Sequence, residues 1–134
     1  MESCTRRGGG STELSEWEAL MTVPREIIDR QVAAYNYRDL EKFVACYALD
    51  AKVVQPDGSL LASGHDEIRA RYGELFDLSP DLRAEIRNRI EVGSVVIDEE
   101  YVTGFLLPGM PTEIHAAVVY RVANDLIQDA HLFG

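Results

Sequence analysis

The sequence contains three histidines, whose imidazole pKa of about 6.5 suits proton transfer near neutral pH. His65, His115 and His131 are far apart in the sequence, and no cluster of cysteines accompanies them, so their spacing predicts no metal site. His65 stands at the start of a predicted helix, where a capping or surface role is expected. His115 and His131 fall at strand positions predicted to point outwards. Only a β-bulge, which reverses that direction, would make His115 a candidate base.

Acidic side chains occur mainly at predicted turns. The tripeptide Pro56-Asp57-Gly58 has the composition of a tight turn. The run Asp98-Glu99-Glu100 is interpreted as a solvated hairpin turn between two strands. The chain has no Gly-rich phosphate loop, no Gly-x-Ser-x-Gly nucleophile elbow and no His-Glu-x-x-His helix. Known catalytic motifs therefore identify neither a reaction nor a cofactor.

Size and charge limit the classes of partner. The 134 residues, 46% of them hydrophobic, are enough for one domain with its own core. The chain has 23 acidic and 13 basic residues, which gives a formal net charge of -10. A charge of this sign repels phosphate groups, so neither nucleic acid nor a membrane surface is an expected partner.

Cysteine content and hydropathy favour a cytoplasmic protein. Cys4 and Cys46 do not form the dense framework of a secreted domain held together by disulfides. No apolar run approaches the roughly 18 residues that a membrane span requires. The opening MESCTRRGGGST is not followed by the apolar core of a secretory signal. Reduced thiols and a cytoplasmic location are therefore expected.

Residues 1–22 are predicted to be a disordered or frayed leader, and residues 23–134 to be the folded domain. The first 13 residues combine a Gly-Gly-Gly run with Ser, Thr and Arg. Such a segment buries too little apolar surface to offset its ordering entropy. Apolar residues from Leu14 to Met21 then recur at near-helical spacing, which also fits a short amphipathic helix. Met21 is an alternative start of the protein.

Three helices are predicted before the main run of strands. Pro24 suits the first turn of a helix over 24–37. Asp39 is the predicted cap of a second, short helix, whose buried stripe extends to Tyr47. A third helix is expected to begin near His65, where acidic residues follow turn formers, and to end at Leu78-Ser79-Pro80.

Strands account for the remainder. A hairpin is predicted over residues 52–62, before the third helix. Between Leu82 and Val92, apolar and charged residues alternate with the period of a strand that has one buried face, which places Asn88 inward. Further strands are predicted at about 94–97, 101–107, 112–122 and 126–133.

Three segments resemble a known family. YNYRDLEKFVACYALDAKVVQPDG and SGHDEIRARYGELF resemble the first half of SnoaL-like and ketosteroid-isomerase-like proteins of the NTF2-like superfamily. AVVYRVANDLIQDAHLF resembles their closing hairpin. Together with the order of elements, the resemblance covers residues 24–133. It implies an α+β fold, in which a cone-shaped, curved antiparallel sheet (an NTF2-like α+β barrel) packs against three helices.

The resemblance also implies a ligand site and an oligomer. A small apolar pocket is expected between the first helix, the third helix and the concave face of the sheet. A homodimer is expected through the outer face of the sheet, where this sequence offers Arg83, Arg87, Arg89, His115 and Arg121.

The catalytic groups of the steroid isomerases are not matched. In those enzymes a helix tyrosine and a strand acid hold the developing enolate while an aspartate on the first strand moves the proton. Alignment places Gln31, Val118 and Gln55 at these three positions. Because an amide cannot act as a base near neutral pH, isomerisation by that mechanism is not expected.

A set of polar residues is nevertheless expected in the pocket. Buried tyrosines more often pack in a core than bind a ligand. Asn88 could instead mark a β-bulge. Asp50 and Asp57 become candidate bases if the first hairpin is shifted relative to the alignment, although both also suit simple capping or turn roles. The expected pocket residues are Gln31, Tyr35, Gln55, Tyr72, Asn88 and Tyr120.

Three functions follow as hypotheses. The first is an isomerase-, cyclase- or lyase-type enzyme that moves a proton on a small hydrophobic molecule resembling a polyketide, a steroid or an aromatic compound. The second is a protein that binds such a molecule without catalysis. The third is a dimeric interaction module without a working pocket. An open cavity with converging hydroxyl and amide groups would favour the first two.

Overall fold

The computed structural model describes residues 23–134, and the predicted leader, with the alternative start at Met21, lies outside these residues. None of the described helices is long and apolar enough to cross a lipid bilayer. The described elements are α2 (Pro24–Tyr37), α3 (Leu40–Ala45), β2 (Tyr47–Val54), β3 (Leu60–Ser63), α4 (His65–Leu78), β4 (Arg83–Val92), β5 (Val95–Thr103), β6 (Ile114–Ala123) and β7 (Leu126–Phe133).

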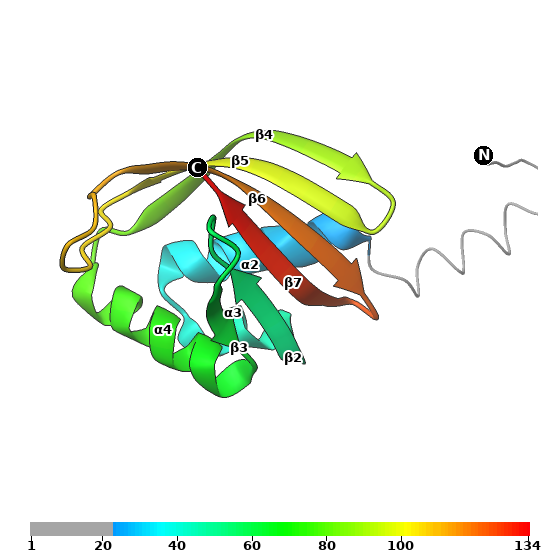
Figure 1. Cartoon of the computed structure of the whole chain (residues 1–134), viewed down its shortest axis with the longest axis horizontal. Helices are drawn as coiled ribbons and strands as arrows, with labels where there is room; N and C mark the ends of the chain where they lie inside the picture. The colour runs from blue at the N-terminus through cyan, green and yellow to red at the C-terminus, as the bar shows by residue number, and fades with distance from the viewer. Residues whose placement is uncertain (1–22) are drawn as a thin grey trace, which may run out of the picture.

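The described strands form one curved sheet in the order β3-β2-β7-β6-β5-β4. Neighbouring strands are antiparallel except β2 and β7, which run parallel. Figure 1 shows the sheet arching over the helices, and its two ends remain open rather than closing into a barrel. The predicted α+β fold, with helices against a curved sheet, is confirmed, while the parallel pair is a feature that the prediction lacked.

Local sequence explains where the helices begin and end. Pro24 lies in the first turn of α2, and Arg38 ends this helix in the left-handed conformation, with a φ of 55°. The Asp39 carboxylate caps α3 by accepting a hydrogen bond from the backbone N–H of Lys42 at 3.2 Å. These two helices therefore match their predicted starts.

The core lies between the helices and the concave face of the sheet. Its members come from every layer, so burying them holds the sheet against α2, α3 and α4. Residues that are almost completely buried include Ile28, Phe43, Val53, Ile68, Val96 and Ile127.

Two predicted elements are wrong in their boundaries. Tyr47 was expected on the buried stripe of the second helix, but it is the first residue of β2. The run Asp98-Glu99-Glu100 was expected to be a hairpin turn, but it lies in the middle of β5. The predicted strands at about 94–97 and 101–107 are therefore one strand, which ends at Thr103. The turn before it lies at Gly93 and Ser94, where Gly93 has a φ of 56°.

The three consecutive acids are tolerated in β5 because each has a different environment. Asp98 is paired with Arg89, and Glu99 accepts hydrogen bonds on the outer face. Glu100 faces inward and lines a cavity. These tertiary contacts outweigh the low strand propensity of acidic residues, which is why local sequence alone predicted a turn.

A β-bulge in β4 changes which residues face inward. Ile86 pairs with Glu100 and Asn88 pairs with the next residue, Glu99, so Arg87 is the extra residue of the bulge. Side chains after the bulge reverse direction. Asn88 therefore points outward, and Arg89 lies on the inner face, not on the outer face as predicted.

Candidate functional site

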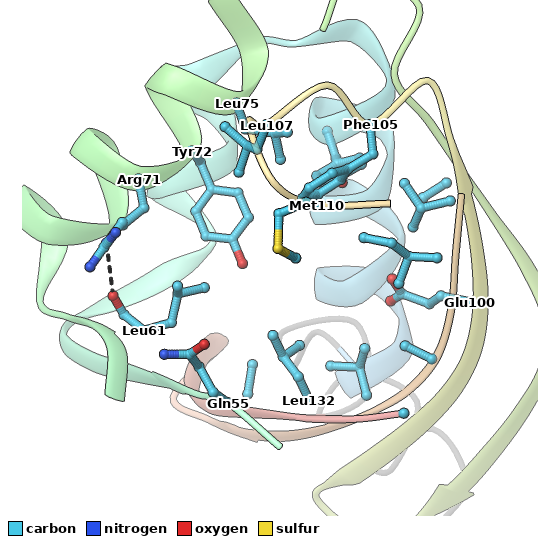
Figure 2. Close-up of a pocket in the computed structure, with 18 of the residues that line it drawn as sticks. Gln55, Leu61, Arg71, Tyr72, Leu75, Glu100, Phe105, Leu107, Met110 and Leu132 are labelled. Carbon is cyan, nitrogen blue, oxygen red and sulfur yellow. Dashed lines mark hydrogen bonds between the residues drawn. The ribbon is translucent and has the colours of Figure 1, made fainter. Parts of the chain in front are cut away.

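A cavity of about 520 Å³ lies between α2, α4, the concave face of the sheet and the loop at residues 104–113. Its wall is mostly apolar, and its size is within the range of small-molecule sites. Figure 2 shows Tyr72 and Leu75 from α4, Leu132 from β7 and Met110 from the loop around this space. The pocket lies at the place that the resemblance implied.

Five of the six polar residues predicted for the pocket line this cavity. They come from three elements, α2, α4 and β6, and from the segment after β2, so distant parts of the chain contribute to one site. The exception is Asn88, which the bulge in β4 turns outward, where its side-chain amide donates to Glu99 at 2.7 Å. The five that line the cavity are Gln31, Tyr35, Gln55, Tyr72 and Tyr120.

The predicted acid–base candidates lie elsewhere. Asp50 is exposed on β2, and Asp57 is exposed in the hairpin turn, where its carboxylate accepts two hydrogen bonds from Ser59. These bonds lower the pKa of Asp57. His115 lies on the outer face of β6, with Nε2 at 2.7 Å from a Glu99 oxygen. None of these three side chains lines the cavity, so the predicted alternatives do not supply a base there.

Glu100 is the acid that the sequence analysis missed. Its carboxyl group projects from β5 into the cavity (Figure 2). Burial in this apolar space is the main reason that its pKa is raised to about 7, and a nearby Asp98 also raises it. The alternation of Val96, Asp98, Glu100 and Val102 along one face of a strand was the available signal, but the interpretation of the acids as a turn concealed it.

One carboxyl oxygen of Glu100 is free for a ligand. Oε2 accepts a hydrogen bond from the hydroxyl group of Tyr120 at 2.9 Å, which opposes the rise in the Glu100 pKa. Oε1 has no hydrogen-bond partner among residues 23–134. A carboxyl group with a pKa near 7 can both accept and return a proton at neutral pH.

Tyrosines from α2, α4 and β2 line the cavity together with Glu100. Burial raises the pKa values of Tyr35, Tyr47 and Tyr72, so these phenols remain protonated hydrogen-bond donors. The hydroxyl groups of Tyr35 and Tyr72 have no acceptor in the described part of the chain, and that of Tyr72 points into the cavity (Figure 2). The site therefore offers hydrogen-bond donors beside Glu100, and Glu74 of α4 is the second acid among the residues that line the cavity.

Gln31 and Tyr47 form a buried polar pair at the inner end of the cavity. The Gln31 amide Nε2 donates to the Tyr47 hydroxyl oxygen at 3.1 Å. The amide Oε1 is buried and has no partner within residues 23–134. Since the Tyr47 oxygen already accepts this bond, its own proton is available for an acceptor.

Gln55 and Arg71 lie at the wall beside α4 and the first hairpin. The Gln55 amide is held by Ser59, whose hydroxyl oxygen accepts from Nε2 at 3.3 Å. Arg71, the basic residue among those lining the cavity, donates to the Leu61 carbonyl at 3.1 Å (Figure 2). Neither side chain is hydrogen-bonded to Glu100, and neither contributes to the shift in its pKa.

Comparison with known proteins identifies similar sequences and structures. Residues 28–130 match the family model described as a SnoaL-like domain. No curated protein matches the chain. A cystatin-fold protein from Novosphingobium aromaticivorans is 25% identical, with a TM-score of 0.77 over 85% of this chain and 100% of the other.

Two further solved structures are similar in fold and carry a named compound. TerC co-crystallised with polyporic acid is 18% identical, with a TM-score of 0.69 over 82% of this chain and 89% of TerC. A protein with a ketosteroid-isomerase-like fold from Catenulispora acidiphila, in complex with trimethylamine, is 18% identical. Its TM-score is 0.66 over 84% of this chain and 87% of the other. At this identity the likeness shows the fold alone.

Proposed function

The chain belongs to the SnoaL-like domain family, and from this premise we propose that it binds a small hydrophobic molecule and alters it by proton transfer, with Glu100 as the acid–base group. The observation that carries the proposal is the Glu100 carboxyl group, which projects into an apolar cavity with a pKa of about 7. A polyketide-, steroid- or aromatic-like molecule suits the apolar wall. The co-crystal of TerC with polyporic acid supports an organic ligand for this fold.

The proposed reaction begins at a carbon next to a ligand carbonyl group. Ionised Glu100 removes a proton from that carbon, and the electron pair moves onto the carbonyl oxygen. A hydroxyl group of Tyr72 or Tyr47 donates a hydrogen bond to the resulting enolate. As the enolate electron pair moves back, Glu100 returns the proton to one of two places. In a ligand with a β,γ double bond it goes to the γ-carbon, which shifts that double bond into conjugation; in a ligand with a β-hydroxyl group it goes to that oxygen, whose C–O bond breaks to release water.

This arrangement differs from that of the steroid isomerases. Their aspartate lies on the first strand, where this chain has Gln55. Here the acid comes from β5, on the opposite wall of the cavity. The amide at position 55 is therefore compatible with proton transfer by this protein, because a different element supplies the base.

Hydrogen–deuterium exchange provides a direct test. A thermal-shift screen of neutral hydrophobic ketones first identifies a ligand, since binding to the folded state raises the melting temperature. In D₂O, the protein is then expected to catalyse exchange of the proton next to the ligand carbonyl, followed by NMR. Glu100→Gln is expected to bind the ligand but to lose about 10²- to 10⁴-fold in the exchange rate.

Glu99→Gln is the matched control, because the adjacent acid lies on the outer face of the same strand. It should keep the wild-type exchange rate. Equal exchange by the wild type and Glu100→Gln would refute the role of Glu100. If the wild type and both variants bind the ligand but none catalyses exchange, only binding without catalysis would remain as a function.

A second candidate function is the noncatalytic binding of an organic amine. Glu100, when ionised, is a carboxylate within a cavity lined by tyrosine and phenylalanine rings, and such surroundings favour alkylammonium ions. The trimethylamine complex of a similar fold supports this candidate. Tetramethylammonium should then bind more tightly than its uncharged analogue neopentane, and its affinity should increase as the pH rises through 7 and Glu100 ionises. This result would favour amine binding over proton transfer.

We also propose that two copies pair through the outer face of the sheet. The apolar residues Ile97, Ala117 and Val119 lie on this face of β5 and β6, opposite to the inward-facing Val96 and Val118. They are partly accessible in the single chain, and charged residues surround them. Burying them against a second copy would remove this apolar patch from water.

A further inference from the structure

An ion-pair network that extends from the core to the surface lies beside Glu100. The Arg89 guanidinium donates to both carboxylate oxygens of Asp98, at 2.6 and 2.8 Å, and to a carboxylate oxygen of Asp29 at 2.6 Å. Asp29 belongs to α2, Arg89 to β4 and Asp98 to β5. The network therefore joins one helix to two strands of the sheet.

The two aspartates differ in their exposure. The Asp98 side chain is completely buried, whereas 62% of the Asp29 side chain is exposed. A buried carboxylate pays a large desolvation cost, which an ion pair offsets without necessarily adding stability. Stability alone is therefore a weak explanation for Asp98, and its position suggests a different role.

Asp98 and Glu100 are two residues apart on β5, and their side chains lie on the same face. Arg89 is directly opposite Asp98 on β4. The β-bulge at Arg87 makes this pairing possible, because without it Arg89 would point to the outer face. The pairing register of β4 and β5 thus places the partly exposed guanidinium of Arg89 and the fully buried carboxylate of Asp98 next to the proposed acid–base group.

We propose that Asp98 and Arg89, tied to α2 by Asp29, are positioning residues that control how readily the Glu100 carboxyl group gives up its proton. The inference rests on the proposed function, since it explains how the acid–base group is tuned. The negative Asp98 favours the protonated form of Glu100, and the positive Arg89 favours the ionised form. Asp98 has the larger effect of the two.

Other groups that face Glu100 act in known directions. The hydroxyl group of Tyr120 on β6 donates to it and favours the ionised form. Tyr35 on α2, Tyr47 on β2 and Tyr72 on α4 remain neutral in the relevant pH range, because burial raises their pKa values. Arg71 and Glu74 on α4 also line the cavity but do not contribute to the shift in the Glu100 pKa. Asp98 and Arg89 are therefore the charged groups whose replacement isolates the effect.

The experiment is a pH titration of the ligand-free protein labelled with ¹³C at the glutamate carboxyl carbon. The Glu100 signal is identified by its absence from Glu100→Gln. Asp98→Asn is expected to move the titration midpoint of Glu100 to lower pH by about one unit, the lower end of the effect of a nearby charge. Arg89 keeps Asp29 as a partner in this variant, so no buried charge is left alone.

Asp29→Asn is the matched control, because it removes the other carboxylate from the same arginine. Its midpoint should remain close to that of the wild type, since Asp29 is exposed and belongs to another element. A role limited to structure predicts lower melting temperatures without a shift in midpoint. An unchanged midpoint in Asp98→Asn, or equal shifts in both variants, would overturn the inference.

A second variant guards against misfolding of Asp98→Asn. The double change Asp98→Asn with Arg89→Gln removes both charges of the pair together and leaves a neutral amide at each position. Its midpoint should lie between those of the wild type and Asp98→Asn, and any other order contradicts the proposal. Because the titration needs no substrate, the network can be confirmed even if the exchange assay disproves proton transfer.

Discussion

Neighbouring acids in β5 illustrate how surroundings decide the chemistry of a residue. Glu99 faces outward, and hydrogen bonds from Asn88 and His115 lower its pKa. Glu100 faces the cavity, and burial raises its pKa to about 7. Two identical side chains, one residue apart, therefore hold their protons over different pH ranges because a strand turns successive side chains to opposite faces.

The raised pKa of Glu100 predicts a characteristic pH dependence of stability. The folded protein keeps this proton up to about pH 7, whereas the unfolded chain loses it near 4.5. Between these values the folded state binds more protons, so the free energy of unfolding falls as the pH rises, by at most about 3 kcal/mol. Below pH 4.5 and above pH 7 this contribution is constant.

Urea unfolding at pH 5 and pH 8 measures this effect. The free energy of unfolding of Glu100→Gln minus that of the wild type should be larger at pH 8 than at pH 5. The reason is that the wild type loses stability when Glu100 ionises, whereas glutamine cannot ionise. Glu99→Gln is the control, since the lowered pKa of Glu99 places its own contribution at more acidic pH. The same stability difference between wild type and Glu100→Gln at both pH values would show that Glu100 is not held in its protonated form.

At the scale of the element, the loop after β5 forms one wall of the cavity. Gly104 begins this loop with a φ of 70°. Backbone hydrogen bonds fix the loop, with Phe105 N–H donating to the Thr112 carbonyl and Leu106 N–H to the buried Ser79 hydroxyl group. The loop thus places Phe105 and Met110 at the cavity.

Gly104→Ala is expected to destabilise the protein by more than Gly93→Ala. Both positions have a positive φ, which costs an alanine about 1–2 kcal/mol. A Cβ atom at Gly104 would also overlap the backbone of Asp81, whereas nothing lies within 4 Å of one at Gly93. Thermal unfolding of both variants tests the difference, and equal melting temperatures would show that the loop adjusts freely.

At the scale of the whole molecule, the two faces of the sheet have different partners. The concave face packs against the helices and encloses the cavity, whereas the convex face carries the proposed dimer contact. Arg83, Arg87, His115 and Arg121 remain exposed, in agreement with their predicted outer positions. Arg89 is the exception, because the bulge turns it to the inner face, where it pairs with Asp98 and Asp29.

The proposed dimer can be disrupted without touching the cavity. Val119→Glu places a charge in the apolar part of the outer face, and the protein is expected to sediment as a monomer where the wild type sediments as a dimer. Leu49→Glu is the control, because Leu49 is 80% exposed on β2, which β7 separates from β6 and β5. A monomeric wild type, or a dimer that survives Val119→Glu, would exclude this interface.

Local sequence determined much of the fold. The turn formers, the capping Asp39 and the helical and strand periodicities predicted three helices, the first hairpin and the last two strands close to their observed places. The segments that resemble SnoaL-like proteins predicted the family, which the match over residues 28–130 confirms. They also directed attention to Tyr72 and Gln55, both of which line the cavity.

Only the tertiary structure decided which acid enters the cavity. Periodicity assumes an uninterrupted strand, but the bulge at Arg87 turned Asn88 outward and brought Arg89 inward. The run of acids in β5 is stable as a strand only because Arg89, Asn88 and the cavity receive its three side chains separately. Strand propensity depends on local sequence and does not include stabilising contacts with residues far away in the chain. For this physical reason Glu100 could be identified from the folded structure but not from the sequence.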